Sequence, residues 1–180
     1  MTGRGGQGAQ LAGNLLAMAF FAEGREVQCF ATYGGARRGT PVSSFIRVDE
    51  RPIRVRCDIE RADALLCFDA SLLAGKALAL ARPETLIVVN SRRAPAQLAA
   101  ELPGYRVLPV DGLGIAQRNG LGRIVNSALI GALARALESP GLDTLRRTIA
   151  EAAPERAAEN VQACLDGYGA VADQMQRAAA

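Results

Sequence analysis

Apolar residues recur at helical spacing directly after the glycine-rich start of the chain. From Gln10 to Ala22 they return every three or four residues, which places them on one face of a helix. Gly24 follows and predicts the end of this helix, because glycine readily adopts the left-handed conformation that closes many helices. The glycine run from Gly3 to Gly8 is therefore expected to be a turn that opens the helix.

The next stretches predict strands. Val27–Thr32 is mostly apolar and indicates a buried strand that ends in the glycine cluster Tyr33–Pro41. Val42–Val48 and Ile53–Cys57 alternate between apolar and polar residues, with a short polar turn between them. This pattern predicts an antiparallel hairpin.

Short apolar runs alternate with helical stretches in the middle of the chain. Strands are predicted at 64–68, 86–89 and 105–110, with helices at 71–80 and 95–101 between them. Continuous apolar strands separated by helices favour an open parallel sheet that is covered on both faces.

The last third of the chain is helical in period. Helices are predicted at 123–137, 142–152 and 156–178, with proline-containing breaks between them. With 180 residues, about half of them apolar, the chain fits one globular domain over residues 1–180. We expect the α/β class: a mostly parallel open sheet with an antiparallel hairpin and a helical C-terminal layer.

The formal net charge of +3 is mild, and Lys76 is the single lysine among many arginines. The arginines are spread along the chain and aromatic residues are few, so we expect no nucleic-acid partner. No apolar run is long enough to span a membrane and no signal-peptide pattern opens the sequence. We therefore expect a cytoplasmic protein with no membrane contact.

Cysteine spacing argues against a metal site. The chain has no histidine, and its four cysteines include no CxxC pair, so the usual zinc and iron–sulfur patterns are missing and we expect no metal in this chain. Cys29 and Cys67 lie in apolar strand-like runs and are expected to be buried hydrophobic residues rather than nucleophiles.

The first candidate binding site is the opening loop, formed by Gly3, Arg4, Gly5, Gly6, Gln7 and Gly8. Glycines allow backbone N–H groups to approach a ligand, and the N-terminus of the following helix favours an anion. The run fits the dinucleotide pattern G-x-G-x-x-G poorly, because no acidic residue ends the next strand. The alternative is that these glycines serve only a tight turn and close helix packing.

The second candidate site is the cluster that contains Tyr33, Arg37, Arg38 and Gly39. It follows a predicted strand, at the edge where open α/β sheets place their binding crevice. An arginine presents a planar fork of donors that suits a phosphate or a carboxylate, either of a ligand or of a neighbouring subunit. The alternative is a solvated surface pair.

A third stretch, Asp111–Gly114, faintly resembles the start of a thiamine diphosphate motif, but the order of its residues is wrong. Asn126 lies in a helical run, where it is expected to cap or to pack. Neither a Ser/His/Asp set nor a phosphate-loop lysine is present. We assign no catalytic residue to this chain.

Six stretches in this order resemble the gamma subunit, or the corresponding domain, of 2-oxoacid:acceptor oxidoreductases. They are GRGGQG, YGGARRGTPV, ADALLCFD, LIVVN, NSALIGAL and NVQACLDGY, and they span residues 3 to about 168. Such enzymes convert a 2-oxoacid and coenzyme A into an acyl-CoA and carbon dioxide, and pass electrons to ferredoxin or NAD.

The resemblance implies a subunit that is not catalytic alone. Thiamine diphosphate with magnesium and the iron–sulfur clusters are then expected in the alpha, beta and ferredoxin-like delta partner chains, with the 2-oxoacid and coenzyme A as substrates. No cofactor is expected in this chain itself. The residues of the two glycine clusters named above are expected to contact either coenzyme A or the partner subunits, with Arg4, Arg37 and Arg38 suited to phosphates.

Two departures from the family pattern stand out. Ala36 occupies a position where family members usually have a glutamate. Members also have an apolar strand before the glycine loop, where this chain has only Met1 and Thr2, so we expect a missing central strand and a true start upstream of Met1.

Other functions stay open. A free-standing flavin- or nicotinamide-binding oxidoreductase would also use a glycine loop, and a purely structural subunit would use none of these residues for ligands. The arginine-rich composition gives a slight preference for an aromatic 2-oxoacid such as phenylglyoxylate or indolepyruvate.

Overall fold

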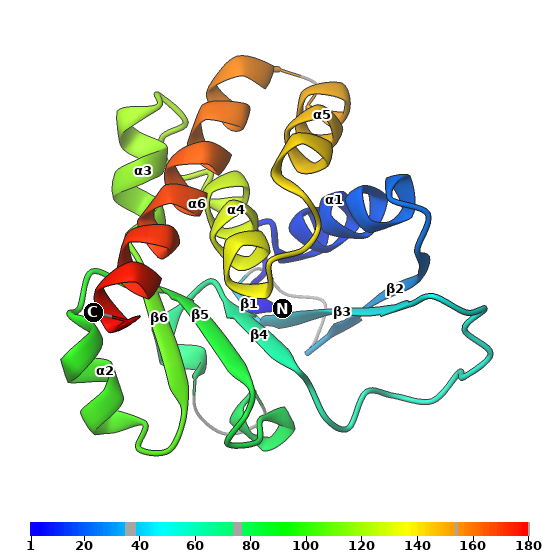
Figure 1. The fold of residues 1–180 in the computed structure, drawn as a ribbon, viewed down its shortest axis with the longest axis horizontal. Helices are drawn as coiled ribbons and strands as arrows, with labels where there is room; N and C mark the ends of the chain where they lie inside the picture. Colours follow the sequence, from blue (N-terminus) through cyan, green and yellow to red (C-terminus); the bar gives the residue numbers. More distant parts are fainter. Residues whose placement is uncertain (35–38, 74–76, 154, 180) are drawn as a thin grey trace.

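The computed structural model describes residues 1–34, 39–73, 77–153 and 155–179, and its centre is a six-stranded sheet (Figure 1). The strands lie in the order β2 (Glu26–Tyr33), β3 (Pro41–Asp49), β1 (Thr2–Arg4), β4 (Ala64–Cys67), β5 (Leu86–Asn90) and β6 (Arg106–Val110). Strands β1, β4, β5 and β6 run parallel, whereas β3 is antiparallel to both β1 and β2. The predicted mixed sheet is confirmed.

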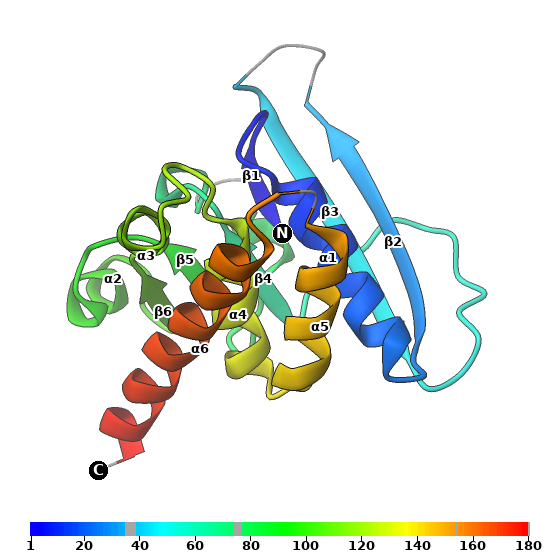
Figure 2. The same cartoon turned by 90° about the horizontal axis from the view of Figure 1, so that it is seen from above.

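Helices cover the sheet in two layers (Figures 1 and 2). One layer contains α1 (Ala9–Ala22), α3 (Gly112–Arg118), α4 (Asn126–Leu137), α5 (Leu142–Ala152) and α6 (Ala157–Ala179). The other layer contains α2 (Pro95–Glu101) and two 3-10 turns, Ala70–Leu72 and Leu78–Leu80. Alternate residues of β4 and β5 enter the two cores, Leu66 and Val88 on the first side, Leu65 and Ile87 on the second.

Most predicted elements are confirmed, and one helix was missed. The strands of the parallel half and the helices at 10–22, 95–101, 142–152 and 156–178 agree with the structure within a few residues. Helix α3 was not predicted, because its start is rich in glycine. The Asp111 side chain accepts a hydrogen bond from the Gly114 amide and so caps this helix.

The predicted hairpin between 42–48 and 53–57 is wrong. Strand β3 pairs with β2 on one edge and with β1 on the other, so no edge of β3 is free for residues 53–57, which form no strand. The true hairpin joins β2 to β3, with the rings of Phe30 and Phe45 stacked at 5.2 Å. Strand β2 is consequently an edge strand, and its residues are half-buried or exposed rather than buried as predicted.

The predicted helix at 71–80 is also wrong within the described residues, where the two 3-10 turns take its place. Asp69 caps the first turn by accepting a hydrogen bond from the Ser71 amide. Leu73 follows at only 5% exposure and packs against Cys67 and Ile87 in the second core. Burying Leu73 directly after the first turn draws the chain toward the sheet.

The expected gap in the sheet does not occur, because Thr2–Arg4 itself forms β1. The Ser44 amide donates to the Met1 carbonyl, and the Phe68 amide donates to the Thr2 carbonyl, so both neighbours of the short strand are satisfied. The Met1 amino group donates to the Ser44 carbonyl at 2.7 Å, and burial lowers the pKa of this amino group to about 6.

Helices α4 and α6 cross at close range because glycines lie at the contact. A Cβ at Gly131 would overlap the carbonyl of Cys164, and a Cβ at Gly167 would overlap the carbonyl of Ala128. The backbones therefore approach more closely than any larger residue would allow.

We expect Gly167→Ala to lower the free energy of unfolding by about 2 kcal/mol, because the added methyl group forces the two helices apart. Gly169→Ala is the matched control, since a Cβ there meets no atom within 4 Å. It is expected to raise stability by about 0.5–1 kcal/mol through helix propensity. Urea unfolding of both variants measures the difference, and equal effects would contradict a tight crossing.

Candidate functional site

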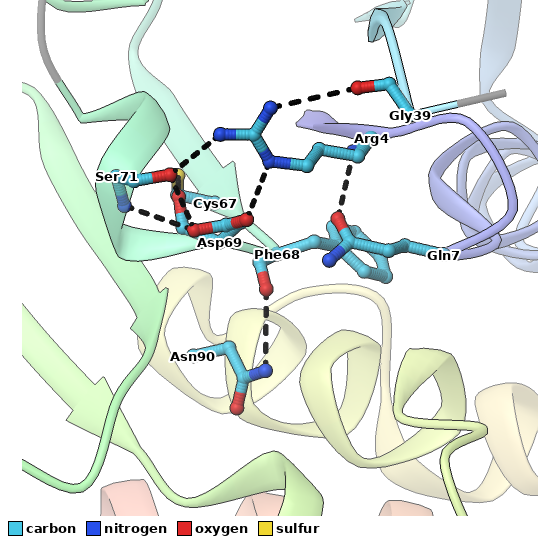
Figure 3. A network of polar contacts seen from close by, with 8 residues as sticks. All are labelled: Arg4, Gln7, Gly39, Cys67, Phe68, Asp69, Ser71 and Asn90. Atoms are coloured by element: carbon cyan, nitrogen blue, oxygen red, sulfur yellow. Dashed lines mark hydrogen bonds and ion pairs between the residues drawn. The ribbon is translucent and has the colours of Figure 1, made fainter.

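The opening glycine loop lies at the carboxyl edge of the parallel strands, between β1 and α1. The Arg4 amide donates to Oε1 of Gln7 at 2.7 Å, and the Gln7 amide donates to the Arg4 carbonyl at 3.0 Å (Figure 3). The Gln7 side chain therefore closes the turn from within. It is a structural part of the loop, whether or not it also meets a ligand.

Three glycines of this loop are required by its geometry. Gly6 and Gly8 have φ angles of 94° and 82°, which disfavour any side chain. A Cβ at Gly3 would lie 3.1 Å from Cβ of Phe68 and 3.2 Å from Cβ of Ala9. These glycines form a tight turn with close helix packing, and among the described residues no atom lies within 4 Å of a Cβ built at Gly6.

Arg4 connects three segments that are distant in sequence. Its Nε donates to Oδ2 of Asp69 at 2.8 Å, its Nη2 donates to Oγ of Ser71 at 2.9 Å, and its Nη1 approaches the Gly39 carbonyl at 3.5 Å (Figure 3). The Gly5 amide also donates to the Thr40 carbonyl. The two glycine clusters and the turn after β4 are thereby held together, and Arg4 is engaged in that contact.

Asp69 is the acidic member of this network. The hydrogen bond from the Ser71 hydroxyl, at 2.7 Å from Oδ1, is the main cause that lowers the pKa of the Asp69 carboxyl, and the bond from Arg4 adds to it against the effect of burial. The carboxyl is therefore ionised at neutral pH and balances the Arg4 guanidinium. Asp69 and Ser71 were not predicted as site residues: Asp69 ends the stretch ADALLCFD but was given no role, and Ser71 stands in no recognisable motif.

The second cluster lies beside the first. Tyr33 ends β2 and donates through its hydroxyl to Oε1 of Gln10 in the first turn of α1, at 2.5 Å. The Gly39 carbonyl lies 3.5 Å from Nη1 of Arg4. Arg37 and Arg38, which were predicted to meet an anion, lie outside the described residues, as does Ala36.

Two helix N-termini meet at the glycine loop. Helix α1 begins after Gly8 and helix α4 begins at Asn126, and neither has a side-chain cap. A Cβ at Gly8 would lie 3.6 Å from Cγ of Asn126. The amide groups of both first turns are unpaired among the described residues, so two positive helix ends face the same region.

Asn126 is the polar residue between these helix ends. It is only 4% exposed, and its Oδ1 finds no hydrogen-bond partner among the described residues. We predicted that Asn126 caps or packs; it packs, but its side chain makes no capping bond. The unpaired Oδ1 of Asn126 is a hydrogen-bond acceptor and therefore suits a donor group of a ligand, whereas the two uncapped helix ends beside it suit an anionic group.

The cysteines do not extend this site. Burial raises the pKa of the Cys67 thiol to about 11 and that of the Cys164 thiol to about 12, so both thiols are protonated at neutral pH. Cys29 is half-buried rather than fully buried, and burial raises its pKa too. Within the described ranges, no group of three or more Cys, Asp and Glu side chains is placed to hold a metal ion.

The fold is that of an α/β protein with a mixed six-stranded sheet. The chain belongs to the pyruvate ferredoxin/flavodoxin oxidoreductase family, which it matches over residues 1–170. It is 39% identical over 154 residues to the pyruvate/ketoisovalerate oxidoreductases common subunit gamma of Thermococcus kodakarensis, covering 83% of this chain and 82% of that protein. The pyruvate synthase subunit PorC of Methanocaldococcus jannaschii is 35% identical over 149 residues, with 82% and 80% covered.

A solved structure has the same fold. Pyruvate oxidoreductase subunit PORC from Thermotoga maritima matches with a TM-score of 0.80 and 27% identity, covering 93% of this chain and 92% of that one. The Thermococcus and Thermotoga relatives are named as subunits of oxidoreductases, as the resemblance in the sequence implies, and the Methanocaldococcus relative is named as a pyruvate synthase subunit. Among the described residues, no helix combines the length and apolar character needed to cross a bilayer.

Ser71→Ala removes the contact that lowers the pKa of Asp69 most, so we expect this pKa to rise toward its ordinary value of 3.8. Because the pKa of Asp69 is lower in the folded than in the unfolded chain, ionised Asp69 stabilises the wild-type fold when the pH is above the pKa of the unfolded chain. This stabilisation is lost as the pH falls through the pKa of the folded chain. Ser71→Ala should lose part of this stabilisation. A carboxyl-carbon NMR titration from about pH 6 to pH 2 measures the shift. Ser139→Ala is the control, and an unchanged Asp69 titration in Ser71→Ala would contradict this network.

Proposed function

We propose that this chain is the gamma subunit of a multi-subunit 2-oxoacid:acceptor oxidoreductase. The complex converts a 2-oxoacid and coenzyme A into an acyl-CoA and carbon dioxide, and passes two electrons to ferredoxin or NAD. The observation that supports this proposal most strongly is the 39% identity, over most of both chains, with the common subunit gamma of Thermococcus kodakarensis. The chain contributes no catalytic residue of its own and works only in the assembled complex.

The partner chains supply the reaction chemistry in this proposal. Thiamine diphosphate with magnesium and the iron–sulfur clusters are held by the alpha, beta and ferredoxin-like delta subunits, in the cytoplasm. The names of the relatives favour pyruvate and ketoisovalerate as substrates. The preference for an aromatic 2-oxoacid, which rested on composition, stays a prediction.

The opening glycine loop and the second cluster beside it are proposed to bind a phosphate-bearing part of coenzyme A. Two uncapped helix N-termini support an anionic ligand at Gly8, and the unpaired Oδ1 of Asn126 is placed to accept a hydrogen bond from a donor group of the same ligand. In this proposal Gly3 to Gly8 form one side of the coenzyme A site. The neighbouring cluster contains Tyr33, Arg37, Arg38 and Gly39. Arg4 holds the two clusters together and is proposed to act through their position rather than through a phosphate contact.

Assembly tests the first part of the proposal. When the chain is co-expressed with the alpha, beta and delta chains encoded beside it, we expect one complex that carries thiamine diphosphate and iron–sulfur clusters. Size-exclusion chromatography and cofactor analysis measure this outcome. A stable monomer that never joins these chains would contradict it, and flavin absorbance in the purified chain alone would favour a free-standing oxidoreductase instead.

Substitutions in the assembled enzyme test the coenzyme A site. We expect Asn126→Ala, and the double substitution Arg37→Ala with Arg38→Ala, to raise KM for coenzyme A about tenfold with kcat little changed. Asn126→Asp should raise KM further, because its carboxylate adds a negative charge beside the bound phosphate. Asn14→Ala, an exposed change on α1, is the control. Unchanged KM in all three variants would remove the coenzyme A site and leave the assembly proposal standing.

A further inference from the structure

The outer edge of strand β2 carries backbone groups that no described residue pairs. The Gly34 amide donates to the Pro41 carbonyl, and in the register of β2 and β3 every second residue from this pair exchanges its hydrogen bonds with β3. The N–H and C=O groups of the residues between them point away from β3. These outward residues are Val27, Cys29, Ala31 and Tyr33. Their backbone groups have no hydrogen-bond partner within the described ranges.

Strand β1 fixes the same alternation from the other side of β3. The Ser44 amide donates to the Met1 carbonyl, and the Ser44 carbonyl accepts from the Met1 amino group, so both backbone groups of Ser44 are used by β1. Ser44 lies opposite Ala31 in the register of β2 and β3. Ala31 therefore receives no hydrogen bond from β3, which agrees with its place among the outward residues.

Helix α1 lies over the antiparallel half of the sheet, next to this edge (Figure 2), and none of its residues is charged. Met18 is 50% exposed and Phe21 is 72% exposed. The exposed face of a helix usually carries charged and polar side chains, and an apolar face without them marks a surface that a partner covers. The outward face of α1 is therefore suited to a protein contact.

An open cavity of about 360 Å³ lies between this face of α1 and strand β2. The described residues that line it include Met18 and Phe21 of α1, Val27 and Cys29 of β2, and Thr148 and Glu151 of α5. Val27 and Cys29 thus have their side chains in the cavity wall and their backbone groups on the outer edge. In a strand added to that edge, the residues opposite them have side chains on the same face, where the cavity receives them.

The connection from β3 to β4 leaves the outward groups free. Nε2 of Gln28 donates to the Val55 carbonyl at 3.1 Å, and Nη2 of Arg47 donates to the Cys57 carbonyl. Figure 1 shows this connection below the sheet, on the side away from α1. Gln28 and Arg47 form one of the hydrogen-bonded pairs of β2 and β3, so the contact uses the inward residues of β2 and none of the outward ones.

Acidic residues border the cavity. Among the described residues of its wall Glu151 alone is charged, and Glu26 precedes Val27 at the start of β2. Both side chains are exposed, and neither forms an ion pair with another described residue. A second copy of β2 would bring Glu26 as its single charge and so no positive charge for Glu151. The charges favour a different chain with a basic residue at this position.

We propose that the outer edge of β2 binds an extended segment of another protein chain, which adds to the sheet as a further strand. Its residues opposite Val27 and Cys29 are apolar and enter the cavity, and a lysine or arginine beside them meets Glu151. In the assembly proposed above another subunit supplies this segment, and in that respect the inference rests on the proposed function. The binding chemistry of the edge does not depend on it.

A peptide tests the binding chemistry on the full chain alone. The probe is acetylated and amidated Lys-Thr-Val-Thr-Val-Thr-Lys, whose valines and lysines share one face when it is extended. At about 1 mM it is expected to slow hydrogen exchange of the outward amides of Val27, Cys29 and Ala31 about tenfold, measured by NMR. The inward amides of Gln28 and Phe30 are internal controls, because they already donate to β3.

Two altered peptides separate the backbone contact from the charge contact. Replacement of both lysines by glutamate should weaken binding about tenfold, because like charges then meet at Glu151. Methylation of both valine nitrogens removes the N–H groups that an added strand donates to β2, and it should abolish the protection. Equal protection by all three peptides, or none by the first, would overturn the proposal.

Substitutions in the chain test the same contacts. Met18→Lys and Leu11→Lys add the same charge to the same helix at residues of nearly equal exposure, 50% and 51%, and of the two Met18 lines the cavity. Met18→Lys should abolish binding of the lysine peptide, whereas Leu11→Lys should change it little. Glu151→Lys should reverse the preference, so that the glutamate peptide binds more tightly. Glu84→Lys, at an exposed residue outside the cavity wall, is its control. Equal losses in both lysine variants of α1 would contradict the cavity as the binding site.

Hydrogen exchange over residues 26–33 in the assembled enzyme, read by mass spectrometry, separates this inference from the proposed function. We expect β2 to exchange more slowly in the complex than in the separate chain. A complex that forms while β2 exchanges at an unchanged rate contradicts the subunit contact and leaves the assembly proposal standing. If no complex forms but the lysine peptide binds, the assembly proposal fails and the edge keeps its binding chemistry. A dimer of the separate chain that protects β2 and excludes the peptide would mean that a second copy occupies the edge and that the proposal is wrong.

Discussion

The sheet depends on three residues. Within the described part of the sheet, Thr2–Arg4 alone join the antiparallel ribbon of β2 and β3 to the parallel half that begins with β4. Both sides of β1 are occupied by backbone hydrogen bonds, so the strand has no exposed edge despite its short length. The carboxyl end of this strand turns directly into the glycine loop, and the position of the candidate site follows from the same three residues.

The parallel half of the fold was predictable because each of its elements carries a local signal. Runs such as Leu86–Val89 are apolar throughout, as expected for strands with helices on both sides. The antiparallel half was predicted wrongly, because residues 53–57 alternate as a strand should but no free edge remains for them. Alternation identifies a segment that is able to pair, and the partner is decided by the rest of the sheet.

The candidate site was predicted in part for a similar reason. The glycines at Gly6 and Gly8 are visible in the sequence because left-handed backbone requires them. Asp69 was given no role and Asn126 was expected only to cap or to pack, since the importance of each comes from a neighbour far along the chain, Arg4 for the first and Gly8 for the second. Spacing along a sequence cannot reveal such contacts, and only the folded chain brings these residues together.

Strand β2 has a consequence for handling the protein in isolation. It is eight residues long, lies at the edge of the sheet and carries a single charged residue, Glu26, at its first position. The open edges of such strands are sites of aggregation, which proteins usually suppress with charges, proline or a covering segment. Beyond Glu26, strand β2 has neither a charged residue nor a proline. We therefore expect this strand to limit the solubility of the separate chain, and conditions that keep the strand paired or covered to keep the protein in solution longer.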